Sequence, residues 1–100
     1  MIKYLKDTNH FKEEINKEKV LVDFFATWCG PCKMLNLTLE SYEKEEPELE
    51  IIKVDIDNFP DLAREYGIMS VPTIVLIKNG QIIKQESGFK NINELKEMLK

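Results

Sequence analysis

The sequence contains few of the residues from which specialised binding sites are usually built. Its 100 residues include two cysteines, one histidine and one tryptophan. A closed zinc site needs about four ligands, and cysteine and histidine together cannot supply that number here. Four glycines and four prolines are too few for a collagen-like or low-complexity chain. These shortages direct attention to the two cysteines, Cys29 and Cys32.

Basic residues and long apolar runs are also scarce. The 14 lysines and arginines are outnumbered by 18 aspartates and glutamates, and the net charge of -4 argues against nucleic acid, because phosphate binding needs clustered basic side chains. No apolar run approaches the roughly 18 residues of a membrane-spanning helix, and residues 1–10 lack the apolar segment of a secretion signal. We therefore expect a cytoplasmic protein that binds neither nucleic acid nor membranes.

What remains is an ordinary globular composition. Hydrophobic residues make up 43% of the chain, which is enough for one buried core at this length. No repeat, linker or change of composition divides the sequence. We expect residues 1–100 to form a single domain.

Strand and helix patterns alternate along the chain. Short apolar runs, rich in β-branched and aromatic residues in most cases, predict strands at residues 2–5, 20–26, 51–56 and 73–77. The first of these patterns is the weakest. Asn79 and Gly80 both suit the positive φ angles of a two-residue type I′ turn, which predicts a hairpin between the last strand and residues 81–86.

The longest helix is predicted over residues 30–46. Leu35, Leu39 and Tyr42 recur at helical spacing and form its buried face. Pro47 ends it, because the residue before a proline is disfavoured in helical conformation.

Three shorter helices are expected, at residues 9–17, 59–66 and 92–100. Phe11 and Ile15 form the buried pair of the first helix. Asn58 is expected to cap the second helix, and Asn91 with Glu94 resembles a capping box for the third. The resulting order predicts an α/β fold with a mixed sheet, in which the early strands are parallel and the hairpin is antiparallel.

The two cysteines flank Gly30 and Pro31 in the stretch FFATWCGPCKML. A helix is predicted to begin here, directly after a buried strand, so Cys29 lies where free N–H groups and the helix dipole stabilise a thiolate. The thiolate is the form that attacks a disulfide. Cys32 lies one turn further on the same side, within reach to resolve a mixed disulfide. We expect Cys29 to be accessible and Cys32 to be more buried.

Other roles for the cysteines are less well supported. A permanent disulfide is disfavoured in a reducing cytoplasm. For zinc, the chain adds only His10, which is distant in sequence. A nucleophile of the cysteine-protease kind would also need His10, for which a solvated or capping side chain is the simpler interpretation. These observations favour a pair that is opened and closed by thiol exchange.

The stretch WCGPCK, with VDFFA before it and SVPT after it, resembles the thioredoxin family. The motifs KVDID, YGI and KNGQ occur in the order of that family, so the resemblance covers nearly the whole chain. It implies the thioredoxin fold, with a central five-stranded mixed sheet flanked by four helices. It also implies a monomeric protein-disulfide reductase that binds no cofactor or metal. Its partners would be disulfide-containing proteins and a thioredoxin reductase that supplies electrons from NADPH.

The resemblance adds three residues to the cysteine pair. Asp23 lies within a buried strand pattern, where burial raises the pKa of a carboxyl, and the matching residue of the family helps to deprotonate the resolving cysteine, here Cys32. Lys53 matches the partner of that aspartate, and Pro72 matches the cis proline of the family. Pattern alone leaves open that Asp23 points to solvent and that Lys53 is an ordinary solvated strand residue.

The resemblance also implies a substrate groove beside the cysteines. Val71 would present its backbone N–H and C=O to an extended substrate segment, a mode of binding that accepts many sequences. The other residues assigned to the groove are Trp28, Gly30, Pro31, Ile68, Thr73 and Gly88, with Gly67 and Met69 at its border.

Several positions depart from the family pattern. Leu37 replaces a proline that is common in the middle of the active-site helix, which suggests a smaller kink. Phe25 stands where many members have a second tryptophan. Ser87 and Phe89 flank Gly88 where the family is often apolar and then small, so one wall of the groove is expected to differ in shape.

Two alternatives remain on the same fold. Oxidants and isomerases of the disulfide isomerase or glutaredoxin kind favour other dipeptides between the cysteines, whereas Gly-Pro indicates a reducing pair. A binding module without turnover is also compatible with the fold, since fold does not fix function.

Overall fold

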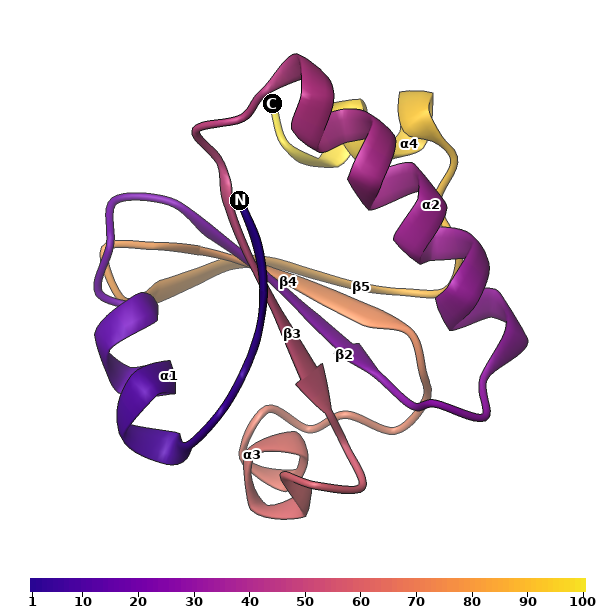
Figure 1. Cartoon of the computed structure of the whole chain (residues 1–100). Coiled ribbons are helices and arrows are strands. Elements are labelled where there is room, and N and C mark those ends of the chain that lie inside the picture. Colours follow the sequence, from indigo (N-terminus) through magenta and orange to yellow (C-terminus); the bar gives the residue numbers. More distant parts are fainter.

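The computed structural model describes residues 1–100 and has the expected alternation of strands and helices (Figure 1). The strands are β1 (Ile2–Tyr4), β2 (Val20–Phe25), β3 (Glu50–Asp55), β4 (Thr73–Lys78) and β5 (Gln81–Ser87). The helices are α1 (Thr8–Glu14), α2 (Gly30–Glu45), α3 (Pro60–Glu65) and α4 (Ile92–Met98). The weak pattern at the start of the chain is thus a strand. None of the helices combines the length and the apolar character needed to cross a membrane.

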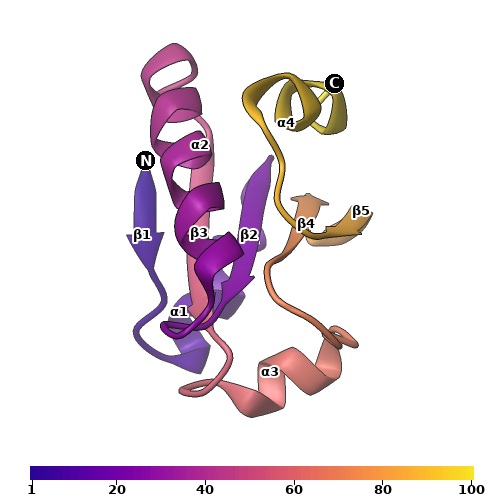
Figure 2. The same ribbon diagram turned by 90° about the vertical axis from the view of Figure 1, so that its right-hand side faces the viewer.

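All strands belong to one mixed sheet with the order β1-β3-β2-β4-β5. β1, β3 and β2 are parallel, whereas β4 runs antiparallel to β2 and β5 antiparallel to β4. The helices α2 and α4 lie on one face of the sheet and α1 and α3 on the other (Figure 1 and Figure 2). The predicted α/β fold, a five-stranded mixed sheet with four helices, is confirmed.

Strand β2 is buried on both faces. Since the side chains of a strand point alternately to its two sides, β2 contributes to the cores on both faces of the sheet. Val22 packs into the core under α1 and α3, together with Phe11. Leu21 packs into the core under α2 and α4, together with Leu35. Asp23 has the same parity as Leu21 and therefore points to the α2 side of the sheet.

The predicted hairpin turn and the predicted capping box are both confirmed. Asn79 and Gly80 have φ angles of 51° and 82°, as a type I′ hairpin requires. At the start of α4, the N–H of Glu94 donates to Asn91 Oδ1 (2.8 Å) and the N–H of Asn91 donates to Glu94 Oε1 (3.0 Å). Both features are local in sequence, which is why pattern alone could predict them.

Helix α1 differs from the predicted range 9–17. It begins one residue earlier because the Asp7 side chain accepts a hydrogen bond from the N–H of His10 (2.8 Å). It ends earlier because the side-chain amide of Asn16 donates to the carbonyl oxygen of Lys12 (2.9 Å). That oxygen is the acceptor that a longer helix would offer to the backbone N–H of Asn16.

The prediction that Asn58 caps α3 is wrong. The N-cap position belongs to Phe59, whose side chain makes no capping hydrogen bond, and the helix begins at Pro60. Proline suits the first turn because its missing N–H has no partner there in any helix. Asn58 instead donates to Asp55 Oδ2 (3.5 Å) and so belongs to the turn that follows β3.

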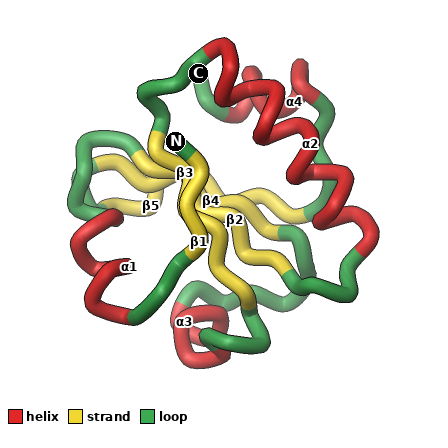
Figure 3. The backbone as a smooth tube through the Cα atoms, viewed as in Figure 1, coloured by secondary structure: helices red, strands yellow, loops and turns green.

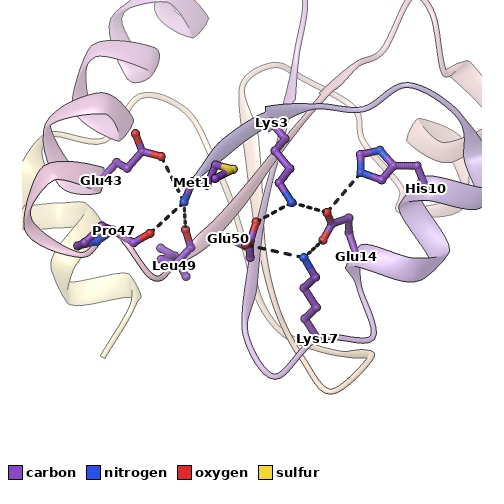
Figure 4. Close-up of polar contacts among 9 residues, drawn as sticks. All are labelled: Met1, Lys3, His10, Glu14, Lys17, Glu43, Pro47, Leu49 and Glu50. Carbon is purple, nitrogen blue, oxygen red and sulfur yellow. Dashed lines mark hydrogen bonds and ion pairs between the residues drawn. The ribbon is translucent and has the colours of Figure 1, made fainter.

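A cluster of ion pairs around the buried carboxylate of Glu14 ties β1 and α1 to β3 (Figure 4). The Glu14 side chain is 5% exposed, and Lys3 Nζ and Lys17 Nζ lie 2.9 and 2.5 Å from its oxygens. His10 Nε2 lies 3.3 Å from the same carboxylate. Glu50 on β3 completes the cluster, 3.4 Å from Lys3 Nζ. The cluster links three elements that are far apart in the sequence.

Candidate functional site

The cysteine pair lies at the start of α2, beyond the ends of the central strands, where β2 and β3 end and β4 begins. Figure 3 shows the loop that joins β2 to α2. Cys29 and Cys32 form a disulfide, with their Cα atoms 5.3 Å apart. Cys29 is the N-cap of α2, as predicted, and its Sγ accepts a hydrogen bond from the N–H of Cys32 (3.1 Å). Pro31 occupies the first helical turn. After reduction, the same N–H group and the helix dipole would stabilise a thiolate at Cys29.

Exposure does not separate the two cysteines as predicted. In the disulfide form Cys29 is 5% exposed and Cys32 is 3% exposed. The Cys29 sulfur is covered because the carbonyl oxygen of Val71 lies 3.7 Å away and Phe25 and Ala26 pack around the pair. The prediction of an accessible Cys29 is therefore wrong for the oxidised protein. The two cysteines differ instead in their polar contacts, because the N–H of Cys32 points at the Cys29 sulfur.

The loop before β4 faces the disulfide. Its Val71–Pro72 peptide bond is cis, as the resemblance implied. The N–H of Gly88 donates to the carbonyl oxygen of Pro72 (2.8 Å), which ties the loop to the end of β5. Gly88 has a φ of 95°, a conformation that favours glycine.

The residues assigned to the groove differ widely in exposure. The exposed ones are Trp28, Gly30, Pro31, Gly67 and Met69. Ile68 is half-buried because it packs against the core. Thr73 is placed differently from the expectation: it is 2% exposed, and its hydroxyl donates to the carbonyl oxygen of Ser70 (2.8 Å). Its side chain thus supports the loop from inside and does not line the groove.

Trp28 is exposed but anchored. Its side chain projects into solvent, with 68% of the residue exposed, and its indole Nε1 donates to Asp57 Oδ2 (3.0 Å). The N–H of Asp57 donates in turn to Asp55 Oδ1 (2.9 Å), so the turn after β3 orients Asp57. Sequence analysis missed Asp57, because no pattern distinguishes it among the many acidic residues of the chain.

Asp23 and Lys53 lie opposite each other on the parallel strands β2 and β3. They are 0% and 4% exposed, and Lys53 Nζ lies 3.8 Å from Asp23 Oδ2. Neither carboxylate oxygen of Asp23 has a hydrogen-bond partner. The alternatives in which Asp23 or Lys53 points to solvent are therefore wrong.

Burial controls the protonation of this pair. It raises the pKa of Asp23 to about 6, and the positive charge of Lys53 opposes this rise without cancelling it. Burial also lowers the pKa of Lys53, against the opposing charge of Asp23. Asp23 can therefore gain or lose a proton near neutral pH.

Sequence analysis did not predict the contacts that Lys53 makes with three other groups. Lys53 Nζ donates to Asn36 Oδ1 (2.6 Å) and lies 4.7 Å and 5.3 Å from the ring centres of Phe25 and Tyr4. A cavity of about 250 Å³ is lined by these groups and by Cys32. Asn36 follows Cys32 by four residues, a helical spacing that places both on one face and was the only signal in the sequence.

No group of three or more histidine, cysteine or acidic side chains is arranged to hold a metal ion. His10 differs from the prediction of a solvated or capping side chain, because its ring contacts the buried Glu14. It therefore belongs to the ion-pair cluster that joins β1, α1 and β3.

Comparison with known proteins agrees with this geometry. The family model described as Thioredoxin matches residues 1–100. The chain belongs to the thioredoxin family. Thioredoxin of Chlamydia trachomatis is 40% identical over 99 residues, which span 99% of this chain and 96% of the relative. The crystal structure of oxidised mitochondrial thioredoxin 3 from Saccharomyces cerevisiae has a TM-score of 0.87 at 37% identity, covering 97% of this chain and 92% of that one.

A third relative is a fusion. The bifunctional thioredoxin reductase/thioredoxin of Mycobacterium leprae is 43% identical over 86 residues, which span 84% of this chain and 19% of the relative.

As a thioredoxin-family member with a Cys29–Cys32 disulfide, this protein is a thiol–disulfide oxidoreductase.

One departure from the thioredoxin pattern has a clear structural setting. Leu37, at the position where the family often has proline, is 65% exposed and lies within α2, a single continuous helix. A residue with a backbone N–H can take part in the hydrogen bonding of the helix at this point, which a proline cannot do. The exposed leucine instead adds apolar surface one turn beyond the cysteines.

Proposed function

We propose that this protein reduces disulfide bonds in other proteins and is returned to its dithiol form by a thioredoxin reductase, with electrons from NADPH. The observation that carries this proposal is the position of Cys29 at the N-cap of α2, where its sulfur accepts the N–H of Cys32. A thiolate is favoured at such a position, and thiolates attack disulfides.

The reaction is proposed to follow two exchanges. The Cys29 thiolate attacks one sulfur of the substrate disulfide, so that a Cys29–substrate bond forms and the other substrate sulfur leaves as a thiolate. Cys32 then loses its proton and attacks Cys29 Sγ, which forms the Cys29–Cys32 disulfide and releases the second substrate thiolate. Two electrons pass to the substrate, and its two thiolates take up protons.

Asp23 is proposed to accept the Cys32 proton. Its pKa of about 6 suits a base that works near neutral pH. Cys32 and Lys53 line the same cavity of about 250 Å³, and Asp23, which is not part of this lining, lies 3.8 Å from Lys53 Nζ. Water in the cavity is proposed to carry the proton from Cys32 toward Asp23. The proposed role of Lys53 is to balance the charge that Asp23 carries when it is ionised.

The substrate is proposed to bind as an extended segment against the backbone of Val71, with Pro72 fixing the course of the loop. The rest of this site would be formed by the exposed Trp28, Gly30 and Pro31 and by the half-buried Ile68 and Gly88. Thr73 would contribute by holding the loop through its hydrogen bond to Ser70 (2.8 Å). Recognition through backbone groups would allow many protein substrates.

The electron donor and cellular setting rest on the family. The fusion of a thioredoxin reductase with a thioredoxin in the relative from Mycobacterium leprae supports a reductase as partner. We place the protein in the cytoplasm, as a monomer with a single domain over residues 1–100. The disulfide itself is the redox group, so no bound cofactor or metal is included in the proposal.

The test is oxidation of NADPH by thioredoxin reductase with insulin as disulfide acceptor. Wild-type protein should turn over, whereas Cys29→Ser should be inactive and Cys32→Ser should accumulate a mixed disulfide with insulin. Full turnover by Cys29→Ser would contradict the mechanism, and wild-type protein that binds insulin without reducing it would be a binding module. A parallel assay with dithiothreitol as reductant separates thiol exchange from recognition by the reductase.

A further inference from the structure

The hydrogen bond between Asn36 and Lys53 is not used in the mechanism above. Lys53 Nζ lies 2.6 Å from Asn36 Oδ1 and 3.8 Å from Asp23 Oδ2. An ammonium and a carboxylate in direct contact are about 2.8 Å apart, so Lys53 binds a neutral amide more closely than the opposite charge beside it. An ammonium has only donors, so the oxygen of the Asn36 amide must be the atom that faces it.

Backbone register does not account for this preference. Lys53 and Asp23 are direct partners on β3 and β2, so the distance between their charges depends on the direction that the lysine side chain takes. The Lys53 side chain extends toward α2, where its ammonium donates a hydrogen bond to Asn36. The ammonium also lies over the rings of Phe25 and Tyr4. Aromatic rings attract a cation, which helps to hold the ammonium in this position.

We propose that Asn36 is a positioning residue, which draws the Lys53 ammonium out of contact with Asp23 and so keeps the Asp23 carboxyl basic enough to accept the Cys32 proton. This inference rests on the proposed role of Asp23. At an effective dielectric constant of about 20, closing the gap between the charges to about 2.8 Å would strengthen their attraction by the equivalent of about one pKa unit. A change at Asn36 that moves the ammonium should therefore change the titration midpoint of Asp23 measurably.

The other charged and titratable groups near Lys53 leave it few acceptors. They come from β2, β1 and α2: Asp23, Tyr4, Cys32, Lys33 and Glu40. Only Asp23 and Glu40 are acidic, and Glu40 is exposed. Without the Asn36 oxygen, the buried carboxylate that remains beside the ammonium is that of Asp23.

The test uses two substitutions that act in opposite directions. Asn36→Leu keeps the size of the side chain but removes the acceptor, so the titration midpoint of Asp23 should fall by about one pH unit. Asn36→Asp binds the ammonium more tightly and repels an ionised Asp23, so the midpoint should rise. The midpoint is measured in the oxidised protein from the ¹³C shift of the Asp23 carboxyl against pH. Resolution of a preformed mixed disulfide at pH 7 should slow about threefold in Asn36→Leu, as for a weaker base.

The matched control is Asn93→Leu, which makes the same exchange at an exposed position of α4 and should change neither quantity. An unchanged Asp23 midpoint in both Asn36 variants, or shifts in the same direction, would overturn the role of Asn36. Opposite midpoint shifts with an unchanged resolution rate would instead overturn the proposed role of Asp23. The carboxyl titration needs no turnover, so it remains valid if the reductase assay fails.

Discussion

The indole nitrogen of Trp28 lies 3.0 Å from a carboxylate oxygen of Asp57, which fixes the direction of the only tryptophan of the chain. This contact joins the loop after β2, in which Trp28 directly precedes Cys29, to the loop after β3. A side chain that is 68% exposed would otherwise sample several rotamers. The bond therefore holds the indole ring next to Cys29 in one direction.

Removal of this anchor should affect substrate binding more than stability. We expect Asp57→Ala to lower kcat/KM for insulin about threefold, because Trp28 must then be ordered when the substrate binds. Stability should change by no more than about 0.5 kcal/mol, since Asp57 is exposed. Fluorescence anisotropy reports Trp28 alone and should fall. Asp57→Asn keeps an acceptor oxygen and is the control; equal anisotropy in all three proteins would contradict this prediction.

Asp23 should make the protein less stable as pH rises. Its pKa of about 6 in the folded state is above the ordinary value of 3.8, so the folded protein binds more protons between these values and loses stability as pH increases through them. Asp23→Asn cannot ionise, and we expect it to be more stable than wild type by about 2 kcal/mol at pH 8 and by little at pH 4.

Urea unfolding at several pH values measures this difference. Asp61→Asn is the control, because Asp61 is an exposed carboxylate on α3. The same pH dependence in Asp23→Asn and wild type would show that Asp23 does not titrate as described.

The Glu14 cluster should act in the opposite direction, at lower pH. Burial raises the pKa of Glu14, but hydrogen bonds from Lys17 and Lys3 outweigh it and lower the pKa from 4.5 to about 2. The stability that the carboxylate contributes is therefore complete above about pH 4.5 and is lost as pH falls toward 2.

We expect Glu14→Gln to cost about 2 kcal/mol at pH 7, measured by urea unfolding, because it leaves the lysines without their buried counter-charge. The difference from wild type should shrink at pH 3. Glu13→Gln changes an exposed neighbour and is the control. A loss that is equally large at pH 3 and pH 7 would assign the effect to packing and not to charge.

The reduced protein should be alkylated first at Cys29. The N–H of Cys32 and the N-terminus of α2 both stabilise a thiolate at Cys29, whereas no comparable group faces Cys32 Sγ. Mass spectrometry after brief treatment with iodoacetamide at pH 7 should find one modification, in the peptide at Cys29. Equal labelling of the two cysteines, or labelling of Cys32 first, would contradict the assignment of Cys29 as the attacking residue.

Much of the fold can be predicted from local pattern. The apolar runs of β2 and β4 and the Asn79–Gly80 turn depend on residues close together in sequence. The end of α1 and the start of α3 could not be predicted in this way. Asn16 and Asn58 each had a choice of hydrogen-bond partners, and the choice depends on the surrounding structure.

The same distinction between local pattern and tertiary contact applies to the candidate site. Cys29 could be placed at a helix N-terminus from the order of strand and helix, whereas Asp23, Lys53 and Pro72 were identified through the resemblance. Asn36 escaped both approaches, because its contact with Lys53 joins a helix to a strand, and their relative placement is known only once the chain has folded.

The two outer strands of the sheet are poor templates for a further strand. β1 has only three residues, and the pairing of β5 with β4 shifts register between Leu76 and Ile77. A short strand and a bulge are both means by which proteins prevent sheets of different molecules from joining edge to edge. The exposed Ile82 and Ile83 lie on β5, where an uninterrupted edge would invite such growth. The short β1 and the irregular β5 therefore make edge-to-edge pairing between molecules less favourable.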